Sequence, residues 1–109
     1  MNVRLYVWQR ATAALMVPLL LVHIAVIFYA SRQGLSAADI LARTRGSVAW
    51  GLFYGVFVAA IAVHAPIGLR TVLSEWTPLP ARTRDVLVVL FGLVLAALGL
   101  RAVVAVVLP

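Results

Sequence analysis

Two histidines and one arginine lie inside long apolar stretches of this chain, where ionisable side chains are uncommon. They are His23, His64 and Arg101. Such side chains are costly in a membrane, and they usually face a protein interior, a cofactor or a cavity. A neutral imidazole can bind haem iron as an axial ligand, or it can hydrogen-bond to a neighbouring helix. The chain has no cysteine, which excludes disulfides, thiolate metal sites and covalent c-type haem attachment.

His64 is flanked by small residues on its own side of a helix. Ala60 and Gly68 stand four residues before and after it and share its face. They leave room beside the imidazole for a flat, bulky group such as haem. Alternatively, they allow close helix packing while His64 bonds to a neighbouring helix. Arg70 ends the apolar run six residues later, so His64 lies about 9 Å from that end of its helix.

His23 lies deeper than His64. It follows Arg10 by 13 residues, or about 20 Å along a helix, so the histidines differ in depth by roughly 10 Å. We therefore do not expect both to bind one iron within one chain. His23 could serve a second haem, but we favour a hydrogen bond across helices. Arg101 lies about 24 Å along a helix from Asp85 and could pair with a haem propionate, although we favour snorkelling to the interface.

Three apolar runs must position these residues. Residues 11–30 and 47–69 contain no Lys, Arg, Asp or Glu, and residues 86–108 contain only Arg101. About 20 helical residues cross a bilayer core, and backbone groups in lipid must pair internally. We predict an all-α fold with a single transmembrane domain over residues 1–109 and spans near these three ranges. The first run is longer than the apolar part of a typical signal peptide, so we expect a span there.

Composition and charge agree with a membrane protein. Hydrophobic residues make up 65% of the chain and charged residues 11%, whereas soluble domains carry about 25% charged residues. The net charge of +6 comes from arginines that flank the spans, which favours membrane lipid and not nucleic acid as the partner. Residues 1–10 and 70–85 carry five arginines and residues 31–46 carry three. The N-terminus is therefore expected in the cytoplasm and the C-terminus on the outer side.

Local sequence signals predict a helix cap, a break between two helices and a close contact between helices. Ser36 followed by Asp39 predicts a short helix in the first loop. Pro78 prevents a continuous helix between the second and third spans. Gly51 and Gly55 form a G-x-x-x-G pattern that permits close helix approach.

Two short motifs resemble those of a known family. Residues 61–76 read IAVHAPIGLRTVLSEW. They resemble the second-helix motif H-x-x-x-G-[LIM]-[RW]-x-[VM]-[LM]-x-[DE]-[YF] of the small membrane-anchor subunits of succinate dehydrogenase, respiratory complex II. Residues 9–13, QRATA, resemble the [HV]-R-[AV]-[ST]-[AG] opening of their first span. Three spans in about 110 residues also match those anchors. Arg10 to Ala13 and the His64-Ala65 pair are similar to the D-type anchor, whereas Gly68 to Arg70 are similar to the C-type. We favour the D-type.

The resemblance implies roles for particular residues. His64 matches the axial ligand of haem b, and Arg10 matches an arginine near the haem propionates and the quinone pocket. Glu75 and Trp76 stand where the family often has Asp-Tyr, whose tyrosine hydrogen-bonds a quinone carbonyl. An indole N–H can also donate such a bond. His23, with Arg101 near its level, is similar to the second haem site of two-haem members.

The resemblance also implies a function. We expect a multi-pass subunit of the bacterial inner membrane that binds haem b and helps to form a site for ubiquinone or menaquinone. Its partners would be a flavoprotein subunit, an iron–sulfur subunit and a second anchor chain or second copy. The chain carries no flavin or iron–sulfur motif, so it would not oxidise succinate alone. The alternatives are a haem-free anchor of the fumarate reductase type and a small membrane scaffold without a redox role. A small transporter is disfavoured because no span holds an acidic residue.

Overall fold

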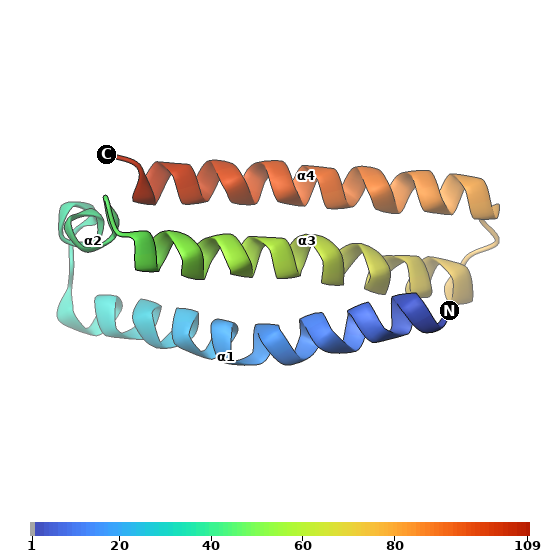
Figure 1. Ribbon diagram of the computed structural model, residues 1–109, viewed down its shortest axis with the longest axis horizontal. Helices are drawn as coiled ribbons and strands as arrows, with labels where there is room; N and C mark the ends of the chain where they lie inside the picture. Colours follow the sequence, from blue (N-terminus) through green and yellow to red (C-terminus); the bar gives the residue numbers. More distant parts are fainter. Residues whose placement is uncertain (1) are drawn as a thin grey trace.

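Four helices make up most of the chain, of which the computed structural model describes residues 2–109. They are α1 (Val3–Gln33), α2 (Ala37–Thr44), α3 (Val48–Trp76) and α4 (Ala81–Val107). α1, α3 and α4 are each long and apolar enough to cross a membrane, which confirms the predicted all-α fold with three spans. α3 runs antiparallel to both α1 and α4, so the two ends of the described chain lie at opposite ends of the bundle (Figure 1).

α1 begins well before the apolar run that predicted it. The side chain of Asn2 accepts a hydrogen bond from the backbone N–H of Leu5 at 2.9 Å and caps the helix. Residues 3–10 therefore belong to α1 and do not form a separate head. Pro18 is the middle residue of α1, and the helix is bent about half-way along its length (Figure 1). A proline removes one backbone hydrogen bond, which explains a bend at this place.

α3 continues past the apolar run to Trp76. It stops there because a proline at position 78 disfavours helical geometry at Thr77, whose backbone is extended. The break predicted from Pro78 is confirmed. The loop predicted over residues 70–85 is much shorter in the structure, and residues 77–80 alone connect α3 to α4.

The short helix α2 has the predicted N-terminal cap. The Ser36 N–H donates to Asp39 Oδ2 at 2.9 Å, and the Asp39 N–H donates to Ser36 Oγ at 3.1 Å. These reciprocal bonds form a capping box. The backbone N–H of Ser36, followed by its hydroxyl, holds the pKa of the Asp39 carboxyl below its ordinary value.

The connection from α2 to α3 holds the last turn of α4. The Thr44 hydroxyl donates to the Val106 carbonyl at 2.6 Å, and the Gly46 N–H donates to the Val107 carbonyl at 2.7 Å. The last carbonyls of a helix have no partner within the helix, so these bonds satisfy two of them. Thr44 is only 2% exposed, which shields its bond from water. Residues 44–46 are therefore a clamp on α4.

α3 is the central helix of the bundle. It packs against both α1 and α4, whereas α1 and α4 hardly contact one another. A methyl group added at Gly99 of α4 would lie 2.5 Å from Val58 Cγ1, and one added at Gly92 would lie 2.8 Å from Pro66 Cγ. The two glycines therefore allow the close approach of α4 to α3.

The G-x-x-x-G pattern of α3 contributes less to packing than the sequence predicted. A methyl group at Gly51 would lie 3.2 Å from Val107 Cγ1, but one at Gly55 would meet nothing within 4 Å. Only the first glycine of the pattern therefore lies at a close helix contact.

One face of α1 lies against α3. Apart from Ala13, the side chains of α1 that are not exposed follow one another at alternating spacings of four and three residues. They are Leu5, Gln9, Thr12, Met16, Leu19, His23, Val26 and Ala30. This heptad spacing marks the contact surface of helices that cross at a shallow angle. Three polar side chains, from Gln9, Thr12 and His23, therefore lie within the contact between α1 and α3.

The buried core of the described chain is small. It consists of Phe57, Ala60 and Val88 with the polar residues Thr12 and Thr44. Most large apolar side chains of the three long helices are instead exposed. Such a surface would be unfavourable in water, but it suits hydrocarbon and the faces of partner helices.

Candidate functional site

His64 of α3 contacts a threonine of α1. The Nδ1 atom of the imidazole lies 3.2 Å from Thr12 Oγ1, within hydrogen-bonding distance. Thr12 is 6% exposed, and its hydroxyl also lies 2.7 Å from the Trp8 carbonyl and 3.2 Å from the Gln9 carbonyl. The two motifs on which the family resemblance rests, one in α1 and one in α3, therefore meet at this contact.

The second ring nitrogen of His64 is available. Nε2 forms no hydrogen bond within residues 2–109, and it is not one of the fully buried polar atoms that lack a partner there. It therefore reaches accessible surface. In histidines that bind metals, one ring nitrogen is commonly hydrogen-bonded to a protein group and the other binds the metal.

Part of the room expected beside His64 is filled by α1. Ala60 is 4% exposed, and a methyl group at Gly68 would lie 3.2 Å from Gln9 Nε2. The Gln9 amide thus lies against Gly68, and its Oε1 atom is buried without a hydrogen-bond partner. The small residues of α3 therefore serve close packing of α1 as well as access to the imidazole.

Arg10, Glu75 and Trp76 lie on the surface towards the end of the bundle where α3 connects to α4. Each is exposed, Trp76 to 80%, and no hydrogen bond or ion pair joins any two of them within residues 2–109. Trp76 follows His64 by 12 residues, or about 18 Å along α3. Arg10 precedes Thr12 by only two residues, so Arg10 lies much nearer the level of His64.

The general direction of helical side chains would reduce the separation between Arg10 and Trp76. Side chains lean towards the N-terminus of their own helix, and α1 and α3 are antiparallel. Arg10 follows this rule, since its guanidinium carbon lies 5.8 Å from the centre of the Tyr6 ring, one turn earlier. Trp76 would lean the opposite way, back towards the middle of the bundle. A ligand at this end could therefore be approached by both side chains.

His23 lines a separate cavity. The cavity has a volume of about 470 Å³, lies between α1, α3 and α4, and includes Ile40 and Thr44 of the α2 helix. The His23 ring makes edge contacts with Tyr54 and Phe57, with ring centres 5.8 and 5.6 Å apart. Its Nδ1 atom is buried without a hydrogen-bond partner. The hydrogen bond across helices that we favoured for His23 is therefore not formed by Nδ1.

His23 and His64 lie at different levels of the bundle. The partner of His23, Phe57, precedes His64 by seven residues, which corresponds to about 10 Å along α3. Arg101 is exposed on α4 and does not line the cavity beside His23, whose α4 residues are Gly99, Ala102, Val103 and Val106. The structure therefore does not bring Arg101 and His23 to one cavity.

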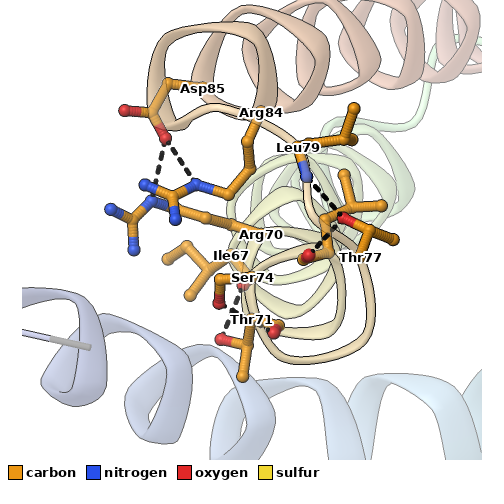
Figure 2. A network of polar contacts seen from close by, with 9 residues as sticks. Ile67, Arg70, Thr71, Ser74, Thr77, Leu79, Arg84 and Asp85 are labelled. Atoms are coloured by element: carbon orange, nitrogen blue, oxygen red, sulfur yellow. Dashed lines mark hydrogen bonds and ion pairs between the residues drawn. The ribbon is translucent and has the colours of Figure 1, made fainter.

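An ion pair that sequence reasoning missed connects α3 to α4. Arg70 Nε lies 3.2 Å from Asp85 Oδ1, and Arg84 Nε lies 3.1 Å from the same oxygen, so one carboxylate binds both arginines (Figure 2). Below it, Thr71 and Ser74 hydroxyls donate to carbonyls of their own helix. Opposite charges on either side of the proline-rich connection were the available sequence signal.

Comparison with known proteins identifies one family. A sequence model of the succinate dehydrogenase/fumarate reductase transmembrane subunit matches residues 1–104. Searches of curated proteins and of solved structures find no match. The family match covers both helices that meet at His64 and Thr12 and all but the last three residues of α4.

Proposed function

Because the chain belongs to the succinate dehydrogenase/fumarate reductase transmembrane subunit family, we propose that it is an anchor that binds haem b through His64 and helps to form a quinone site. The observation that carries the proposal is the state of His64, with Nδ1 beside a buried hydroxyl and Nε2 unbonded and accessible. Haem b, when bound, supplies one-electron transfer between an iron–sulfur subunit and quinone. The second axial ligand would come from another anchor chain or a second copy.

The chain's own residues would bind and protonate quinone. Arg10 carries a permanent positive charge, which would stabilise negative charge on a quinone oxygen. Trp76 would donate its indole N–H to a quinone carbonyl, and Glu75 would deliver protons to the reduced ring. All three are exposed towards the end of the bundle that the arginine count assigns to the cytoplasm. A flavoprotein and an iron–sulfur subunit would dock at this end, in a bacterial inner membrane.

The sequence around the two motifs favours the D-type anchor. Arg10 to Ala13 and the His64-Ala65 pair support this assignment. Gly68 to Arg70 are instead similar to the C-type anchor, so the assignment rests on the larger number of D-type positions.

The first test is the visible spectrum of the complex purified through a tag on this chain. We expect a b-type absorbance spectrum together with a flavoprotein and an iron–sulfur protein. His64→Ala should abolish or strongly alter the spectrum, and an unchanged spectrum would discard His64 as the ligand. The same partners without a Soret band would indicate a haem-free anchor of the fumarate reductase type. A preparation without any flavoprotein would indicate a scaffold.

His23 provides the control and a second candidate haem site. The cavity of about 470 Å³ and the unpartnered Nδ1 atom support a second haem there, whereas the position of Arg101 outside the cavity does not. We expect one haem per flavin and a spectrum that His23→Ala leaves in place. Two haems per flavin, with one lost in His23→Ala, would establish the second site instead.

A further inference from the structure

The hydrogen bonds of Thr12 determine which nitrogen of His64 carries the proton. A threonine hydroxyl has one proton to donate and lone pairs to accept with. Two oxygens at 2.7 Å repel one another unless a proton lies between them, so the Thr12 proton points to the Trp8 carbonyl. The contact from Thr12 Oγ1 to His64 Nδ1, at 3.2 Å, must then be one in which the hydroxyl oxygen accepts. Nδ1 is therefore the protonated nitrogen.

We propose that Thr12 is a positioning residue that holds His64 in the tautomer protonated at Nδ1, with the lone pair of Nε2 free. The value of this tautomer for binding iron rests on the proposed function, because a histidine binds iron only through an unprotonated nitrogen. The tautomer itself is a property of the protein alone.

Three features fix the position of the Thr12 hydroxyl relative to the His64 imidazole. Thr12 is 6% exposed, so water cannot easily replace the hydroxyl as the partner of Nδ1. Its bond to the carbonyl four residues earlier selects one side-chain rotamer, which fixes the direction of the lone pairs. Thr12 also lies on the heptad face of α1, so the close packing of α1 on α3 sets the distance to the imidazole.

The arrangement also links the ligand to the proposed quinone site. Arg10 lies two residues before Thr12, within the same turn of α1. A displacement of this turn would therefore move the partner of the imidazole and the arginine together. α1 would act on the metal ligand without contributing a ligand of its own, as partners of histidine ligands often do.

The experiment measures the tautomer first in the full chain without haem. The chain is labelled with ¹⁵N-histidine in lipid nanodiscs, and the His64 signals are assigned by their loss in His64→Ala. At about pH 8.5, where an ordinary imidazole is uncharged, we expect protonated Nδ1 and unprotonated Nε2. Thr12→Val preserves the shape of the side chain but removes the acceptor, so the Nδ1–H preference should be lost. Thr12→Ser should restore it.

A matched control separates this role from a general effect of removing a hydroxyl. Thr71 bonds to the carbonyl four residues earlier at 3.2 Å and forms no hydrogen bond with His64, so Thr71→Val should leave the tautomer unchanged. In the assembled complex, Thr12→Val should weaken haem binding by about 10- to 100-fold, with a changed b-type spectrum, and Thr12→Ser should reverse both effects.

The outcomes for the tautomer and for haem are separable. A wild-type His64 protonated mainly at Nε2, or a Thr12→Val variant with an unchanged tautomer and intact helix content, would overturn the role of Thr12. A wild-type complex without haem, but with Nδ1 protonated, would overturn the haem site and leave the tautomer assignment in place.

Discussion

Gly99 of α4 lies so close to α3 that it is a sensitive position for stability. A methyl group at Gly99 would lie 2.5 and 2.9 Å from the two Cγ atoms of Val58 and 3.2 Å from its Cβ atom. Carbon atoms pack best at about 3.5–4.0 Å, so the shortest contact is about 1 Å too close. Rotation of Val58 would not relieve the clash, because Cβ itself is close and a β-branched side chain is stiff in a helix. The helices would have to separate.

The expected cost of Gly99→Ala follows from two opposing terms. Forcing extra volume into a packed contact costs about 1–3 kcal/mol, while replacing glycine by alanine within a helix returns up to about 1 kcal/mol. We therefore expect a net loss of up to about 2 kcal/mol in the free energy of unfolding, and a stability below that of Gly55→Ala in every case. The full chain in mixed micelles can be unfolded with SDS and followed by circular dichroism and tryptophan fluorescence.

Gly55→Ala is the matched control, because a methyl group there meets nothing within 4 Å. It should leave the stability unchanged within about 0.5 kcal/mol, or raise it slightly through the helix propensity of alanine. Val58→Ala removes both Cγ atoms but keeps Cβ, so in a Val58→Ala background Gly99→Ala should cost clearly less than it does in the wild type. The reasoning is refuted if Gly99→Ala is as stable as Gly55→Ala, or if the two changes at 99 and 58 are simply additive.

Three further predictions concern the ends of the bundle. Thr44→Val should lower the free energy of unfolding by about 1–3 kcal/mol, because the Val106 carbonyl loses the buried hydroxyl that donates to it; an SDS midpoint equal to that of the wild type would contradict this. By carbon NMR, the pKa of the Asp39 carboxyl should lie below that of an ordinary aspartate. Its contribution to the stability of α2 is therefore present above the ordinary pKa and is lost as the pH falls through the lowered pKa. Asp39→Asn should remove this acid dependence. Asp85→Asn should lower the free energy of unfolding only slightly, because the ion pair between Asp85 and Arg70 is exposed. The difference from the wild type should vanish in about 0.5 M salt, which screens exposed charges. A loss of stability that persists in salt would contradict an exposed ion pair as its cause.

The number and type of helices followed directly from the sequence. Three apolar runs of sufficient length determine three spans, since a backbone in lipid must pair within its own helix. The short helix α2 was also predictable, because a capping box is a local signal within four residues. The exact ends of the helices were harder to predict from the sequence. Asn2 caps α1 ahead of the apolar run, and α3 continues to Trp76 because nothing before Pro78 stops it.

The contacts of the site depend on the register between α1 and α3, and a single sequence does not determine this register. His64 could be singled out as an ionisable group in a span, but its partner on α1 depends on how far α1 slides along α3. Thr12 was visible only as part of a short motif. The glycines were a similar case. The G-x-x-x-G pattern at Gly51 predicted a close helix approach, but among the glycines an added methyl group would meet its nearest neighbour at Gly99, seven residues after another glycine in α4.

The polar contacts that join the helices are stronger at one end of the bundle than at the other. At one end, residues 44–46 hold the last carbonyls of α4 through two short bonds, one of them from a fully buried hydroxyl. At the opposite end, the polar link described between α3 and α4 is a water-exposed pair between Arg70 and Asp85. Thermal fluctuations of the helices should therefore grow from the clamped end towards the end that carries Arg10 and Trp76. If partner subunits dock at that end, as proposed, they would meet a surface able to adjust to them. The cavity beside His23, which Thr44 lines, lies towards the clamped end.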